Sequence, residues 1–190
     1  MSRMYSGFVL LSLFLFSGCL TASRKIIKFD LNPDGSGQGS MIFLNIMSMQ
    51  EDENDRSVQD YTILVNDWLN GTQFEEANPS LYDIQKRLVA DKNKLNAEVT
   101  FKFGNYADVG LYRHHDSGPW MYYAYLNTSK VEYFDTTNGE YAGGAMPVIF
   151  WPEKTTEFRI ANFFNHEERP VHSLYSLYKD LGVAPNEVEK

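Results

Sequence analysis

Two apolar runs on either side of a six-residue turn segment constrain the fold of this chain most. Residues 25–31 and 40–49 alternate in part between apolar and polar side chains, and Asn32-Pro33-Asp34-Gly35-Ser36-Gly37 lies between them. Proline fixes φ at the first corner of a turn, aspartate hydrogen-bonds to its own backbone, and glycine tolerates a positive φ. The pattern predicts a β-hairpin whose second strand is apolar on both sides and lies near the middle of a sheet.

Period-two alternation predicts further strands. It is cleanest over residues 95–103, where Leu, Ala, Val, Phe and Phe alternate with polar residues, and this predicts a strand with one solvent-exposed face. Less regular patterns predict strands at residues 120–126, 130–135, 148–151 and 156–161. Three glycines over residues 138–145 predict a mobile loop.

Spacings of three and four residues predict helices. One side of a helix that ends at Gly71 is predicted to hold Val58, Tyr61, Thr62, Val65, Trp68 and Leu69. Further helices are predicted from Pro79 to about Ala90 with Asn78 as its cap, over residues 106–113, and over 173–181. Helices mixed with antiparallel strands indicate an α+β fold, in which two to four helices pack on a mainly antiparallel sheet that begins with the hairpin.

Composition limits the classes of protein to which the chain can belong. Its 190 residues suit one domain, and 43% hydrophobic and 15% aromatic residues exclude a disordered chain. The net charge is -8, and the lysines and arginines are dispersed, whereas proteins that bind nucleic acid carry clusters of them. We therefore expect no nucleic-acid partner.

The N-terminus has the pattern of an export signal. Arg3 precedes an apolar run over residues 7–16, and the small residues Ser17 and Gly18 then lead to Cys19, which is the single cysteine of the chain. Ten apolar residues are too few for a transmembrane helix, which needs roughly 20, but they suffice for a signal peptide.

This arrangement resembles the lipobox of bacterial lipoproteins, in a relaxed form similar to that of spirochaete and Bacteroidetes proteins because Phe16 replaces the usual leucine. The resemblance implies that residues 1–18 are removed, that Cys19 carries the lipid, and that residues 19–24 form a tether before one globular domain, residues 25–190. Leu20 after the cysteine implies the outer membrane, with the periplasmic or surface face left open.

The domain itself is similar only to uncharacterised bacterial lipoproteins that begin with a turn of the Asn-Pro-Asp-Gly-Ser-Gly type, a likeness that implies no activity. Its aromatic residues are the remaining functional feature, because exposed Tyr and Trp side chains suit protein or carbohydrate ligands. The aromatic residues predicted to bind a ligand are Trp120, Tyr122, Tyr123, Tyr125 and Tyr141. We expect a membrane-anchored binding or envelope-structural protein.

No motif predicts a catalytic residue, a metal site or a cofactor. Residues 30–35 begin like a calcium loop, but Met41 stands where the bidentate glutamate should be. His166 begins a zinc-protease pattern that Pro170 interrupts. Two alternatives stay open: an anchored hydrolase that acts on an envelope or host polymer through His114, Asp116 or His166, and a carrier of a soluble ligand.

Overall fold

A large antiparallel sheet, a small sheet and short helices make up the protein, which confirms the predicted α+β class. The computed structural model describes residues 20–50, 54–124, 132–166 and 169–182. The strands are β1 (Leu20–Leu31), β2 (Gly37–Met49), β3 (Leu81–Asp91), β4 (Lys94–Phe103), β5 (Leu111–Tyr112), β6 (Trp120–Tyr123), β7 (Glu132–Thr137), β8 (Glu140–Tyr141), β9 (Val148–Trp151), β10 (Glu157–Phe164) and β11 (Val171–Ser173). The helices are α1 (Ser57–Ile63), the π-helix η1 (Leu64–Leu69), α2 (Gln73–Ala77), the 3-10 helix η2 (Tyr106–Val109) and α3 (Tyr175–Leu181).

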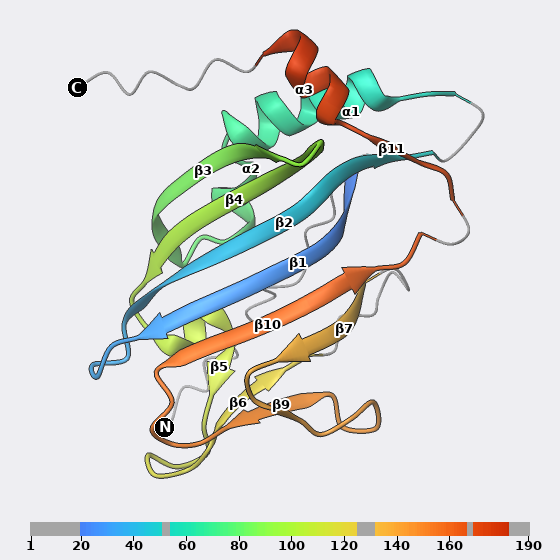
Figure 1. Ribbon diagram of the computed structural model, residues 1–190. Coiled ribbons are helices and arrows are strands. Elements are labelled where there is room, and N and C mark those ends of the chain that lie inside the picture. The colour runs from blue at the N-terminus through green and yellow to red at the C-terminus, as the bar shows by residue number, and fades with distance from the viewer. Residues whose placement is uncertain (1–19, 51–53, 125–131, 167–168, 183–190) are drawn as a thin grey trace, which may run out of the picture.

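Seven strands form the main sheet, in the spatial order β3-β4-β2-β1-β10-β7, and β11 pairs with the end of β2. The hairpin of β1 and β2 lies in the middle of this sheet (Figure 1). β2 pairs with β1 on one side and with β4 on the other, as predicted for its second strand. The small sheet has the order β5-β6-β9-β8.

The hairpin turn has the predicted chemistry. The Asn32 N–H donates to the Ser36 carbonyl at 2.8 Å, and the Asp34 carboxylate accepts from both the N–H and the hydroxyl of Ser36. Gly35 has φ +87°, a conformation that glycine adopts without steric cost. These local hydrogen bonds lower the pKa of Asp34, so the carboxylate stabilises the turn.

The first residues of β1 correct the predicted tether. Strand β1 begins at Leu20, and Leu20, Thr21 and Ala22 are buried and paired with Ser48, Met47 and Ile46 of β2. Residues 20–24 therefore belong to the sheet, and the first three of them are part of its core. The prediction of a tether over residues 19–24 is wrong for residues 20–24.

The helix predicted from Pro79 to Ala90 is wrong, because β3 occupies this part of the chain. Ile84, Lys86 and Leu88 are half-buried and alternate with exposed neighbours, which is the period of a strand. Pairing with β4 provides backbone partners for the segment, and this outweighs its helical spacing. Asn78, predicted to begin the helix, instead donates from its side-chain amide to the Phe74 carbonyl at the end of α2.

The helix predicted up to Gly71 is present as α1 and η1. Tyr61 and Trp68 are buried, as predicted, and Leu64 joins them on the inner side. Val58 and Thr62 are the exceptions, since both are exposed, Val58 to 62%. The switch from α to π geometry within this segment changes which residues share a face.

The remaining predictions hold in part. β4, β6, β7, β9 and β10 match the five predicted strands, although residues 125–131 lie outside the described part of the chain. The helix predicted over residues 106–113 covers only η2, and β8 lies within the predicted loop of residues 138–145. The last predicted helix is α3, preceded by the fully buried Leu174, and β11 was not predicted.

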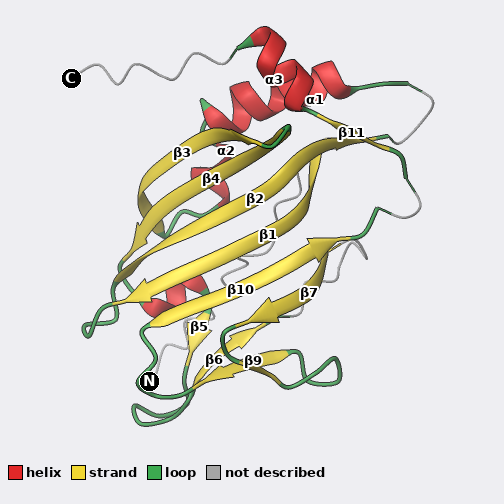
Figure 2. Ribbon diagram, viewed as in Figure 1, coloured by secondary structure: helices red, strands yellow, loops and turns green. Residues whose placement is uncertain are grey.

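One face of the main sheet, here called the covered face, holds the hydrophobic core. The Phe29 ring contacts Phe103, and Phe158 of β10 contacts two tryptophans of the small sheet, Trp120 and Trp151. Phe74 of α2 packs against Phe101 of β4. The small sheet and the helices therefore share one core with the main sheet (Figure 2).

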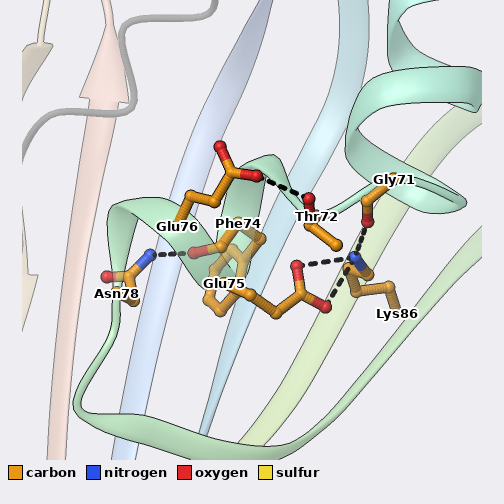
Figure 3. A network of polar contacts seen from close by, with 7 residues as sticks. All are labelled: Gly71, Thr72, Phe74, Glu75, Glu76, Asn78 and Lys86. Carbon is orange, nitrogen blue, oxygen red and sulfur yellow. Dashed lines mark hydrogen bonds and ion pairs between the residues drawn. The ribbon is translucent and has the colours of Figure 1, made fainter.

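The edge strand β3 is held to the helices by a polar network. The Lys86 ammonium donates to the Gly71 carbonyl at 2.6 Å and pairs with the Glu75 carboxylate at 2.8 Å. Thr72 donates to Glu76 at 2.6 Å in the same segment (Figure 3). These contacts hold α2, and the segment between η1 and α2, against the edge strand β3.

Candidate functional site

The face of the main sheet opposite the core, here called the open face, has no described helix or strand over its centre (Figure 1). The strand register aligns polar side chains across it. Gln85, Thr100, Ser40 and Lys28 form one row across β3, β4, β2 and β1. Tyr82, Lys102, Gln38 and Asp30 form the next row on the same four strands.

All residues of these two rows except Tyr82 line a hollow of about 560 Å³, within the roughly 300–1,000 Å³ typical of small-molecule sites. We call it the polar hollow. Its polar side chains are Lys28, Asp30, Gln38, Ser40, Asp83, Gln85, Glu98, Thr100 and Lys102. The hollow thus presents amide, hydroxyl, carboxylate and ammonium groups together, and it lies at the end of the sheet where the hairpin turns.

Three of the five charged side chains that line the polar hollow take part in ion pairs. Lys102 and Asp83 form an ion pair at 2.9 Å, and Glu98 pairs with Arg87. The hydrogen bond that Lys102 donates to the Asp83 carboxylate raises the pKa of Lys102. Gln38 donates to Asp30 at 3.4 Å. The surface is therefore polar without a strong net charge.

A β-bulge shapes one wall of the hollow. The register of β3 against β4 shifts between Tyr82 and Gln85, and Asp83 has φ +51°. A non-glycine residue at positive φ is uncommon and marks a position that the surrounding structure constrains. The bulge brings Asp83 to the Lys102 side of the sheet, where the ion pair holds it.

The aromatic residues predicted to bind a ligand do not form one surface. Trp120 and Tyr122 are buried, with exposed fractions of 4% and 5%, because β6 turns both side chains into the core that the two sheets share. This corrects the expectation that they are available to a ligand. Tyr123 is 56% exposed, Tyr141 is half-buried and stacks on Phe134 at 4.1 Å, and Tyr125 lies outside the described residues.

The core contains a buried polar cluster that was not predicted from the sequence. The Lys25 side chain is 2% exposed and its ammonium lies 2.5 Å from the Glu132 carboxylate, which also accepts from the Asn162 amide at 2.8 Å. Burial and, to a lesser extent, Glu132 raise the pKa of Tyr122. The sequence does indicate that Lys25 is buried, because Lys25 shares its strand face with the apolar Ile27 and Phe29. The cluster lies in the core and stabilises the packing of β1, β10 and β7.

The histidines proposed for a hydrolase are not brought together. His114 and His115 are exposed in the segment after β5, with ring centroids 4.1 Å apart, and Asp116 is exposed beside them. His166 follows the other end of β10, and its Nε2 atom lies 2.7 Å from the Thr21 hydroxyl. Strand β10 separates the two groups, and its eight residues span about 23 Å from the first to the last.

The position of His166 predicts how stability depends on pH. Partial burial lowers its pKa, so the unfolded state takes up the proton first as the pH falls below about 6.5. We expect the free energy of unfolding to fall between pH 7 and pH 5, and His166→Gln to flatten this part of the profile. Urea titrations at several pH values measure the free energy of unfolding of both proteins. His115→Gln, at an exposed position, is the control, and an unchanged slope in His166→Gln would contradict the assignment.

An apolar cavity lies beneath η1, between Phe43, Ile46, Trp68 and Leu88, and has a volume of about 40 Å³. That is room for two or three waters, since one water needs roughly 10–15 Å³ on this scale. The cavity is too small to enclose a carried ligand. It therefore gives no support to the carrier alternative.

No known protein family, curated protein or solved structure matches this chain. Among the described residues, no group of three or more His, Cys, Asp or Glu side chains could hold a metal ion. Within those same ranges, no helix is long and apolar enough to cross a membrane. The features of the chain that bear on its function are therefore the open face and the N-terminal sequence.

Proposed function

We propose that this protein is a lipid-anchored component of the bacterial cell envelope that binds a partner or ligand through the open face of its main sheet. The observation that supports binding most is the polar hollow of about 560 Å³ on a face without a described covering element. A binding protein needs such a preformed concave surface and no convergent catalytic groups. The anchor is supported by the sequence alone, through Ser17-Gly18-Cys19 after the apolar run. Leu20 favours the outer membrane as its destination.

The position of β1 gives this proposal a definite geometry. A lipid on Cys19 would lie one residue from the start of β1, which runs from Leu20 to Leu31. Twelve strand residues span about 36 Å from the first to the last. Asp30 of the polar hollow lies at the far end of this strand, so an anchored molecule would hold the hollow away from the bilayer and toward approaching ligands.

Cys19→Ser tests the anchor. We expect the wild-type protein, expressed in a bacterium fed an alkyne-bearing fatty acid, to become labelled through Cys19. The variant should stay unlabelled, because a hydroxyl does not replace the thiolate nucleophile in thioether formation. The measurement is fluorescence of the clicked label on a gel, together with the intact mass of the protein.

Ser17→Ala serves as the matched control, because it keeps a small residue before the cleavage site and should leave labelling unchanged. Equal labelling of the wild-type protein and Cys19→Ser would overturn the assignment of the lipid to Cys19. An unlabelled wild-type protein would remove the anchor from the proposal and leave the binding face to be tested by itself.

A further inference from the structure

The spacing of the polar hollow suits a ligand with many hydroxyl groups. Neighbouring strands lie about 4.8 Å apart and side chains on one face repeat about every 7 Å along a strand. The register therefore sets Gln85, Thr100 and Ser40 in one row and Gln38 in the next. Amide and hydroxyl groups both donate and accept hydrogen bonds, so this grid can match the alternating donors and acceptors of a sugar ring.

The charge balance of the hollow indicates that its ligand is uncharged. Lys102 is paired with Asp83, and Glu98 with Arg87. The other two charges in the hollow, Lys28 and Asp30, have opposite signs and lie on the same strand. A polyphosphate or a polycation would be attracted by one sign of charge and repelled by the other.

An exposed aromatic side chain stands at the β3 end of the second row, next in sequence to Asp83 of the polar hollow. Tyr82 is 48% exposed and pairs in register with Lys102, on the opposite side of β3 from the buried Leu81. A tyrosine ring offers a rigid apolar plate and a hydroxyl edge, which suits stacking against the C–H face of a sugar.

The position within the sheet disfavours a peptide that adds as a strand. Such a peptide binds to the free backbone groups of an edge strand, whereas β4, β2 and β1 are each paired on both sides. β3 is an edge strand, but a peptide added to its free edge would extend the sheet beyond β3 and would not lie over the rows of β4, β2 and β1, so recognition at the hollow uses side chains. Resting on the proposed function, we infer that the open face binds an uncharged oligosaccharide, held by the amide and hydroxyl side chains of the polar hollow and stacked on Tyr82.

The experiment titrates the purified full-length protein, in a detergent without a sugar headgroup, with defined ligands by isothermal calorimetry. The probes are maltohexaose, cellohexaose and N-acetylchitohexaose as neutral sugars, a hyaluronan hexasaccharide as an acidic one, and one acidic and one basic peptide. We expect at least one neutral sugar to bind. Tyr82→Ala and Gln85→Ala should each weaken that binding by at least about tenfold, the cost of losing one well-placed contact.

Matched variants elsewhere control for general effects of each substitution. Tyr112→Ala removes an exposed tyrosine from the small sheet, and Gln59→Ala removes an exposed glutamine from α1. Both should bind the sugar as the wild-type protein does, and circular dichroism should give all four variants the wild-type spectrum. Retained binding in the controls with loss in Tyr82→Ala and Gln85→Ala supports the inference.

The other outcomes overturn it in distinguishable ways. If only the acidic sugar or a peptide binds, and Tyr82→Ala and Gln85→Ala weaken it, the ligand class is wrong while the binding face proposed above stands. If a ligand binds equally well to both variants, or if none of the probes binds, the inference fails together with the binding part of the proposed function. The anchor is judged separately by the labelling of Cys19.

Discussion

Lys25→Ala is expected to lower the free energy of unfolding by about 3–5 kcal/mol, the range observed when one partner of a buried ion pair is removed. The ammonium of Lys25 lies 2.5 Å from Glu132, whose side chain is only 11% exposed. Without Lys25 the carboxylate stays in the core with the Asn162 amide as its remaining partner. Urea denaturation followed by tryptophan fluorescence measures the loss.

Two further variants separate the charge from the side-chain volume. Lys25→Met combined with Glu132→Gln removes both charges, keeps an acceptor for Asn162, and should recover stability to within about 1.5 kcal/mol of the wild-type protein. Lys28→Ala, on the exposed side of the same strand, should change it by less than about 0.5 kcal/mol. A loss below about 1 kcal/mol in Lys25→Ala would mean that the ammonium is solvated and the pair is not buried.

Gly37→Ala is the second variant with a large expected effect. A Cβ at Gly37 would overlap the backbone oxygen of Asp30 and the ring of Phe103. The backbone oxygen cannot rotate away as a side chain can, so the two hairpin strands would have to separate. We expect a loss of about 2–3 kcal/mol in the free energy of unfolding, measured by the same denaturation.

Gly144→Ala is the matched control, since a Cβ there meets no atom within 4 Å. It should alter stability by less than about 0.5 kcal/mol. Equal effects at Gly37 and Gly144 would contradict the close approach of β1, β2 and β4 at the hairpin.

The parts of the fold that the sequence predicts are those with short-range causes. The hairpin turn depends on Pro33, Asp34 and Gly35, which act within a few residues of one another. The alternation from Leu95 to Phe103 has one regular period, and strand β4 follows it. Local chemistry decides these elements, so a pattern in the sequence suffices to predict them.

Pairing between distant segments decides the rest. Spacing at residues 81, 84 and 88 fits a helix, yet β4 supplies a partner for β3 that no local pattern reveals. In β2, Asn45 adopts φ 56° and its N–H donates to the Asn96 side chain, 51 positions away. The irregularity places Ile46 and Phe43 around one cavity, whereas strict alternation assigns them to opposite faces.

The candidate site was missed for a related reason. Read along the chain, the residues of the candidate site look like ordinary residues of a polar loop or a helix. Only the register of four strands brings together Tyr82, Gln85, Gln38 and Asp30. The aromatic segment at Trp120 is conspicuous in the sequence, but contacts with Phe158 and Tyr106 bury its tryptophan. Side-chain type predicts what a residue can do, and topology decides whether it reaches solvent.

The early start of β1 fixes an order of events in the maturation of an anchored molecule. A peptidase that cuts before Cys19 needs the chain on both sides of the bond to be extended and accessible. In the folded protein Leu20 and Ala22 are buried, in a strand that lies between β2 and β10. If Cys19 carries the proposed lipid, acylation and cleavage would have to be complete before this end of β1 enters the sheet, and export, processing and folding would then follow one another as successive steps.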